Sequence, residues 1–326
     1  MILFKYKLIN FLLILTILNL IGCNQTKVIE NDALSPEIKI DNEKSKITEG
    51  KLNLTVSILP QKYFVEKIGG ELVTVNVMVE PGMSAETYEP LPQQLSNLSK
   101  SSAYISIGVP FEQTWLEKIK SANTNIPIIN SGAGIDKIPM IGHHHDHEEI
   151  DEHHHEQEGE KIEAENLDPH IWLSPKLAKI QAKNIYQELV KLDPKNQTIY
   201  KENLDKFIIE IEDLDQQITD KFANINKRKF VIYHPAWGYF AKDYNLQQIP
   251  IEFEGQEATT AELVNLVKEA KSDNITVIFA QPQFSSKTVD TLAKEIGGEV
   301  VLLDDLAENW SENLLDVADK LAQSMK

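Results

Sequence analysis

Apolar residues recur along the chain in two alternating patterns. Short runs rich in β-branched residues are typical of strands, and apolar residues every three or four positions are typical of helices. The first half predicts strands at 53–58, 73–79, 103–107 and 126–129, with helices at 61–68, 91–98 and 111–120. Strands that alternate with helices predict a parallel sheet covered by helices on both faces.

The same alternation returns after a long helical region. A helix at 175–192 is followed by one at about 194–222, whose apolar positions are Tyr200, Leu204, Phe207, Ile208, Ile211, Leu214, Ile218 and Phe222. Beyond it, the pattern predicts strands at 230–233, 276–280 and 299–303, with helices at 237–244, 261–271, 286–296 and 310–324. The second of the two central helices would be about 40 Å long. We interpret it as a spine that joins two lobes, the alternative being a long surface helix inside one domain.

The predicted fold class is therefore α/β, with two parallel-sheet lobes linked by a single long spine helix. We divide the chain into a signal segment (1–22), a disordered tether (23–50), an N-terminal lobe (51–193) that includes a loop at 141–167, the linking helix (194–223) and a C-terminal lobe (224–326). The tether is assigned from its polar composition, which lacks apolar periodicity.

The first 22 residues are typical of a targeting segment. Lys5 and Lys7 precede an apolar stretch at 8–21, which is shorter than the roughly 20 residues that span a bilayer. The stretch ends in Leu-Ile-Gly-Cys, which resembles the lipobox of bacterial lipoproteins. This resemblance implies cleavage before Cys23 and acylation of its thiol, so we expect an extracytoplasmic protein attached to the membrane by its lipid anchor only. The alternative is a plain secretory signal with an incidental cysteine.

Composition excludes several classes of protein. The chain has 32 basic and 50 acidic residues, for a formal charge of −18, which becomes −20 when the two lysines of the signal segment are removed. Such acidity disfavours nucleic acid as a partner, because phosphates would be repelled. With one cysteine, the chain has no internal disulfide and no multi-cysteine metal site. We expect a monomer.

The loop at 141–167 holds the densest cluster of candidate metal ligands. Seven of the nine histidines lie there: His143, His144, His145, His147, His153, His154 and His155. Residues 143–165 also carry ten acidic side chains and one lysine. Neutral imidazole suits Zn, Cu, Ni and Fe. We interpret the segment as a mobile auxiliary metal-binding loop, the alternatives being a solvated loop without a role or an expression tag.

The two remaining histidines, and a pair of acidic residues, lie at element boundaries. His234 directly follows the strand 230–233, His170 precedes the helix 175–192, and Asp304 and Asp305 follow the strand 299–303. In open parallel sheets, ligands bind beyond the carboxyl ends of the strands. A lone histidine is more often structural, and the two aspartates could also cap the last helix. No metalloprotease helix, phosphate-binding glycine loop or serine elbow is present in the sequence.

Together these pieces resemble the zinc-binding (ZnuA-like, TroA-superfamily) components of bacterial metal ABC transporters over about residues 51–326. The most specific pieces are the lipobox, the histidine-rich loop and the runs DPHIWLSP at 168–175, HPAWGYF at 234–240 and FAQPQF at 279–284. The resemblance implies two α/β lobes joined by one long helix, with a metal site in the cleft between them.

The resemblance also implies the ligands. His170 and His234 match family ligands, and the acidic ligand of manganese-type relatives falls near Asp304. A further family ligand is a histidine in a Gly-x-Ser-Pro-His-x-Tyr motif, and Glu86 stands in its place here. The implied set is therefore Glu86, His170, His234 and Asp304, unless water replaces Glu86. Two imidazoles and two carboxylates suit tetrahedral Zn²⁺, and the added carboxylate makes Mn²⁺ the alternative.

We therefore expect the extracytoplasmic solute-binding component of a zinc ABC transporter, which delivers Zn²⁺ to a membrane permease and catalyses no reaction. The alternatives are a manganese-binding component of the same fold, a metal-binding adhesin, or a secreted metal-dependent hydrolase. The hydrolase would need an open coordination position and a general base, for which Glu257 or Asp305 would serve.

Overall fold

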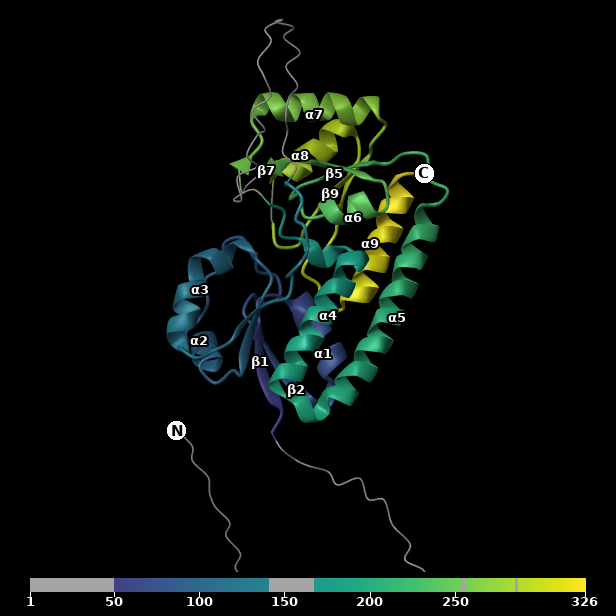
Figure 1. Cartoon of the computed structure of the whole chain (residues 1–326). Coiled ribbons are helices and arrows are strands. Elements are labelled where there is room, and N and C mark those ends of the chain that lie inside the picture. Colours follow the sequence, from purple (N-terminus) through teal and green to yellow (C-terminus); the bar gives the residue numbers. More distant parts are fainter. Residues whose placement is uncertain (1–49, 141–166, 254–255, 285–286) are drawn as a thin grey trace, which may run out of the picture. The chain divides into compact units, whose positions relative to one another are not determined.

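The computed structural model describes residues 50–140, 167–253, 256–284 and 287–326 (Figure 1). The chain from Glu49 to Lys326 forms one compact unit. The predicted signal segment, Cys23, almost all of the tether and the seven loop histidines lie outside the described residues. No helix among the described residues is both long enough and apolar enough to cross a membrane.

The first lobe is built on a four-stranded sheet whose pairings are all parallel, with the strand order β2-β1-β3-β4. Its strands are β1 (Leu52–Val56), β2 (Val73–Val77), β3 (Ala103–Ser106) and β4 (Ile128–Asn130). Its helices are α1 (Leu59–Gly69), the short η1 (Gly70–Leu72), α2 (Pro92–Leu98) and α3 (Pro110–Ala122). Prolines at the first turns of α1, α2 and α3 suit helix starts, where the missing N–H leaves no hydrogen bond unmade.

The second lobe repeats this plan with the strand order β10-β9-β5-β6, again all parallel. Its strands are β5 (Lys229–Ile232), β6 (Gln247–Pro250), β9 (Val277–Ala280) and β10 (Glu299–Leu302), beside an antiparallel pair of β7 (Glu252–Phe253) and β8 (Gln256–Glu257). Its helices are α6 (Gly238–Asp243), α7 (Thr260–Ser272), α8 (Lys287–Ile296) and α9 (Trp310–Ser324). The predicted fold class is confirmed, and β6 is an addition that the sequence pattern did not predict.

Between the lobes lie η3 (Ile171–Leu173), α4 (Pro175–Leu192), η4 (Pro194–Asn196) and the 26-residue α5 (Gln197–Phe222). The predicted apolar stripe of α5 is buried, apart from Ile208, which is partly buried against the core. Early in α5, Asn203 Nδ2 donates to the carbonyl of Ile68 in α1; near its end, Lys221 pairs with Asp319 of α9. This helix therefore contacts both lobes, as expected of a spine (Figure 1).

One core extends through both lobes. It runs from the first sheet through α4 and α5 to one face of the second sheet, while a second cluster lies on the other face beneath α7 and α8. Trp310 at the start of α9 packs against Phe64 of α1, with ring centroids 4.9 Å apart, and against Phe207 of α5. The last helix of the second lobe thus returns to the first. The exact domain boundaries remain predictions.

The base of the histidine-rich loop is held by a short antiparallel pairing. Pro139 and Leu167 form an isolated β-bridge, and Asp168 N–H donates to the carbonyl of Ile138 at 2.8 Å. The hydroxyl of Tyr239, in α6, accepts from Ile138 N–H and donates to the Asp168 carbonyl. The two ends of the loop therefore lie side by side, against the second lobe.

Candidate metal site

Glu86 enters the site from the first lobe, in the turn that follows β2. Its backbone N–H donates to Ser84 Oγ, and the carbonyl of the neighbouring Ala85 accepts from Phe111 N–H at the start of α3. The Glu86 side chain keeps 28% of its surface exposed. The turn is thus tied to α3, while the carboxylate stays open to arriving solute.

His170 lies on the segment that leads into η3 and α4, and it is almost fully buried. Asp168 holds it twice, because Asp168 Oδ1 accepts from the His170 backbone N–H at 2.9 Å and lies 2.8 Å from Nδ1. The other carboxylate oxygen, Oδ2, lies 2.7 Å from where a β-carbon on Gly238 would stand. A side chain at position 238 would therefore displace the carboxylate that orients His170.

His234 follows β5 at the carboxyl edge of the second sheet, and it is also buried. Its Nδ1 lies 3.0 Å from Glu252 Oε2. Gln281, at the end of β9, fixes the backbone of His234 by donating to its carbonyl at 2.8 Å and accepting from its N–H at 3.3 Å. Both imidazoles thus have Nδ1 engaged by a carboxylate, which leaves Nε2 of each as the atom that can bind a metal.

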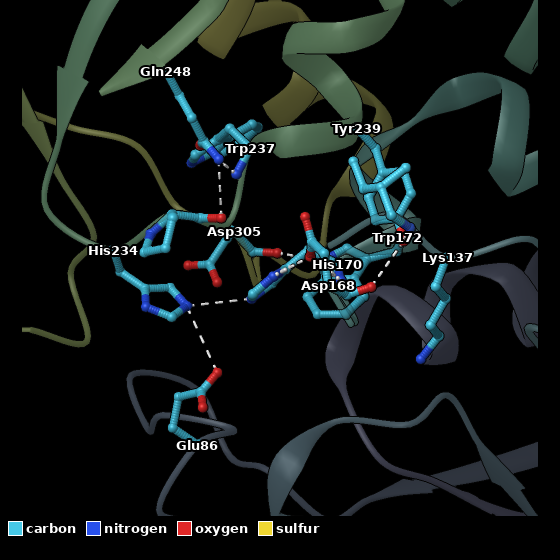
Figure 2. A network of polar contacts seen from close by, with 12 residues as sticks. Glu86, Lys137, Asp168, His170, Trp172, His234, Trp237, Tyr239, Gln248 and Asp305 are labelled. Carbon is cyan, nitrogen blue, oxygen red and sulfur yellow. Dashed lines mark hydrogen bonds and ion pairs between the residues drawn. The ribbon is translucent and has the colours of Figure 1, made fainter. Parts of the chain in front are cut away.

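The two Nε2 atoms and the Glu86 carboxylate converge between the two lobes (Figure 2). His170 Nε2 and His234 Nε2 are 3.3 Å apart, and His234 Nε2 lies 3.6 Å from Glu86 Oε1. One ligand atom from each of the three residues lies within 4.8 Å of the others. Two donors at 2.0–2.1 Å from a tetrahedral Zn²⁺ would be separated by about 3.3 Å. The separation of the two imidazoles therefore fits a tetrahedral ion without rearrangement.

The space that these residues surround is small, at ≈ 10 Å³, and its lining includes Glu86, His170, His234 and Asp305. A cavity of about 10–15 Å³ holds a single water molecule. The space between these side chains is thus suited to a single ion.

Of the four predicted ligands, Glu86, His170 and His234 form the group whose ligand atoms converge, and neither Asp304 nor Asp305 is part of that group. Asp304 Oδ1 accepts from Leu306 N–H and from Gln283 Nε2, and Asp304 is not among the residues that line the cavity. The next residue, Asp305, does line it. Asp305 Oδ1 is buried and has no hydrogen-bond partner among the described residues.

Electrostatics at the site favour a cation. Burial alone would lower the pKa of His234, but the hydrogen bond to Glu252 and the charges of Glu86, Glu252 and Asp305 outweigh it, so the pKa of His234 is raised. Burial raises the pKa of Asp305, although the nearby charges of His170 and His234 oppose this. Buried carboxylates without a cation are costly, and a divalent ion would neutralise them.

Sequence reasoning missed the supporting residues Asp168, Glu252 and Gln281. Asp168 lies two positions before His170 in the run DPHIWLSP. A carboxylate so close to a candidate histidine ligand could have been recognised from the sequence as its supporting residue. Glu252 is 18 residues from His234 and Gln281 is 47 residues away, and only the fold brings them to the histidine.

Comparison with known proteins agrees with this geometry. The family model described as "Zinc-uptake complex component A periplasmic" matches residues 54–326. The high-affinity zinc uptake system protein ZnuA of Bacillus subtilis is 32% identical over 260 residues, which cover 78% of this chain and 79% of that protein.

Solved structures point the same way. A crystal structure of ZnuA is 46% identical, with a TM-score of 0.76, covering 85% of this chain and all of the other. A zinc-bound deletion mutant of ZnuA gives the same identity and TM-score, over 85% and 99% of the two chains. The laminin-binding protein of Streptococcus agalactiae, 22% identical with a TM-score of 0.71 over 85% of this chain and all of the other, shares the fold.

Members of the matched family bind metal for transport and are not enzymes, which leaves the hydrolase alternative without support. The chain belongs to the ZnuA family, whose members are the solute-binding components of zinc-uptake ABC transporters.

Proposed function

We propose that this chain captures Zn²⁺ at Glu86, His170, His234 and Asp305 and delivers it to the permease of its transporter. The observation that carries the proposal is the 3.3 Å separation of the two Nε2 atoms, each on an imidazole whose Nδ1 is held by a buried carboxylate. Imidazole nitrogen is a preferred zinc ligand, and two nitrogens with two carboxylates complete a four-coordinate site.

The fourth position goes to Asp305 rather than Asp304. The Asp305 carboxylate is buried at the cavity with one oxygen unpaired, whereas Asp304 Oδ1 is occupied by two donors. The two residues offer a matched test, because Asp305→Asn removes a charged ligand and Asp304→Asn removes a charge outside the cavity. Zinc affinity should fall by much more in the first variant than in the second.

The proposal is tested by calorimetric titration of the purified, metal-free protein with Zn²⁺. We expect one tight site, which is lost when His170 and His234 are both replaced by alanine. Glu89→Gln serves as the control for Glu86→Gln, because Glu89 is exposed three residues away and does not line the cavity. Unchanged zinc affinity in the double alanine variant would refute the assignment.

Manganese is the second candidate cargo, favoured by the carboxylate of Glu86 at a position where the family motif has histidine. Oxygen ligands suit Mn²⁺ better than they suit Zn²⁺. Parallel titration with Mn²⁺ decides between the two ions, and tighter binding of Mn²⁺ would reassign the cargo.

Attachment to the membrane is proposed to depend on Cys23 and its acyl chains. Each buried methylene contributes about 0.8 kcal/mol, so several chains together give durable anchoring. Cys23→Ala should abolish labelling of the protein with a radioactive fatty acid. Equal labelling of this variant would argue against acylation at Cys23.

The histidine-rich loop is proposed to gather Zn²⁺ at an auxiliary, weaker site, because its seven imidazoles are close together in the sequence. Removal of residues 143–165 should leave the tight site intact and abolish additional weak binding in the same titration. Equal zinc stoichiometry with and without the loop would contradict this role.

A further inference from the structure

The run FAQPQF at 279–284 contains two glutamines that are used differently. Gln281 engages both ends of its amide with the backbone of His234. Gln283 lines the metal cavity, and its Nε2 donates to Asp304 Oδ1 at 2.8 Å. Its other amide atom, Oε1, is buried and has no hydrogen-bond partner among the described residues.

The orientation of the Gln283 amide is fixed by its neighbour. Asp304 Oδ1 also accepts from Leu306 N–H at 2.9 Å, so this carboxylate is itself held in place. A flipped amide would set two acceptor oxygens against each other, because an ionised carboxylate only accepts hydrogen bonds. The amide N–H group must therefore face Asp304, and the carbonyl oxygen must face away from it.

A buried carbonyl oxygen without a partner is costly, and native structures retain such groups where a ligand, an ion or a water completes them. The cavity that Gln283 lines has room for one particle of the size of a water molecule.

We propose that Gln283 Oε1 is a fifth, neutral oxygen donor to the bound ion and that it sets the selectivity of the site between Zn²⁺ and Mn²⁺. This inference rests on the proposed function. Four ligands already satisfy Zn²⁺, which is most often tetrahedral and expands only sometimes to five. Mn²⁺ prefers oxygen ligands such as carboxylate and carbonyl groups, so it gains more from the fifth donor. Asp304 acts as the positioning residue that orients this donor.

The test is a pair of titrations, with Zn²⁺ alone and with Mn²⁺ alone, of the purified protein and its Gln283→Met variant. Methionine keeps the length of the side chain and removes the hard oxygen. We expect Mn²⁺ affinity to fall by at least about 10-fold, since even the loss of a supporting contact of a metal site costs about 10- to 100-fold, and Zn²⁺ affinity to fall by less than about threefold.

Gln281→Met is the matched control, because Gln281 positions His234, which serves both ions. This variant should weaken Zn²⁺ and Mn²⁺ by similar factors. A spectroscopic measurement accompanies the titrations: the visible absorption bands of bound Co²⁺ should become more intense in Gln283→Met, as they do when the coordination number decreases towards four.

A second variant tests the same donor without introducing a sulfur atom. Gln283→Leu removes both amide atoms, and we expect the same selective loss of Mn²⁺ affinity. A loss of Zn²⁺ affinity as large as that of Mn²⁺ would contradict the fifth-donor role.

The outcomes separate the two proposals. If the unmodified protein binds neither ion, the proposed function fails. If it binds both ions and Gln283→Met leaves the ratio of the two affinities unchanged, the fifth-donor role is overturned while the proposed function stands. The temperature of unfolding with chelator present shows whether each variant is folded, and Gln283→Leu decides between the outcomes if Gln283→Met does not fold.

Discussion

At the scale of single residues, two carboxylates decide which nitrogen each histidine offers. Asp168 and Glu252 accept at Nδ1 of His170 and His234, which fixes both tautomers and aims both Nε2 atoms at the same point. Without these partners, an imidazole could present either nitrogen or rotate away. The direction of the ligands is thus built into the protein before an ion arrives.

Removal of either charge should weaken metal binding without unfolding the protein. We expect Asp168→Asn and Glu252→Gln each to lower zinc affinity by about 10- to 100-fold, because the supporting carboxylate raises the basicity of its histidine and holds the ring. Competition with a chromophoric zinc chelator measures the change. Affinities like that of the Glu89→Gln control would show that the two carboxylates have no part in binding.

A second prediction concerns a buried carboxyl group away from the metal. Glu112, in α3, is only 5% exposed. Its carboxylate accepts hydrogen bonds from Ser57 Oγ and from backbone N–H groups after β3. Its titratable neighbours are Tyr104 and Lys137. Burial raises the pKa of Glu112, although the hydrogen bonds and the charge of Lys137 oppose this. The folded protein therefore holds the proton at a higher pH than the unfolded chain does.

The sign of the pH effect follows from this. Stabilisation by the protonated group is complete below the ordinary pKa of a glutamate and is lost as the pH rises through the raised value. The free energy of unfolding of the unmodified protein, relative to Glu112→Gln, should therefore decrease as the pH rises from about 4 towards 7. Urea unfolding of both proteins at several pH values measures this, and a constant or increasing difference would contradict it.

The sequence alone indicated which ends of strands and helices carry candidate ligands. It did not determine which side chains at those ends enter the site. His170 and His234 were visible because both stand at element boundaries near a carboxyl edge. Asp304 and Asp305 could not be told apart, since a shift of one residue after β10 decides which carboxylate enters the cavity. That shift depends on how the turn packs against Trp172, whose Nε1 donates to the Asp305 carbonyl at 2.6 Å.

At the scale of elements, α5 combines a buried stripe with an exposed face on one continuous helix. Its periodicity was strong enough to predict from sequence, since seven apolar side chains at spacings of three and four are buried.

Strand β6 was not predictable, because Gln-Gln-Ile-Pro has little β-branched character. It forms at the edge of the sheet, where a proline is tolerated since its missing N–H has no partner strand.

Two isoleucines of α5 give a matched pair for stability measurements. Ile211 is fully buried, and Ile209, two positions earlier on the opposite face, is 59% exposed. We expect Ile211→Ala to lower the free energy of unfolding by about 2–5 kcal/mol, because it leaves a cavity in the shared core. Ile209→Ala should change it by less than about 0.5 kcal/mol. Denaturant unfolding measures both free energies. Similar decreases in the two variants would mean that burial of the apolar stripe of α5 does not account for its contribution to stability.

At the scale of the whole molecule, the proposed ligands and the core connect the same parts of the chain. Glu86 belongs to the first lobe, and His234 and Asp305 belong to the second, while α5 and the returning α9 join the lobes through one core. Trp172 and Trp310 add cross-links, since Trp310 Nε1 donates to the Trp172 carbonyl at 2.7 Å. Large separation of the lobes would break this core, so we expect only small changes on metal binding.

Metal binding should therefore stabilise the entire unit in one cooperative transition. A ligand that is present at about 1,000 times its dissociation constant adds about 4 kcal/mol to the free energy of unfolding, which for a unit of this size raises the melting temperature by roughly 10 °C. Calorimetric scans with Zn²⁺ and with chelator measure the shift. Two separate transitions, only one of which responds to zinc, would show that the lobes unfold independently.

The pairing of Pro139 with Leu167 has a consequence for how this scaffold tolerates change. Antiparallel partners lie about 5 Å apart, so the chain between them bridges no distance that the fold requires. The fold therefore does not fix the length of that segment, while Asp168, next to the bridge, holds His170. The same junction is a natural place to insert a foreign peptide, because both ends of the insert would continue from chain positions that are already paired.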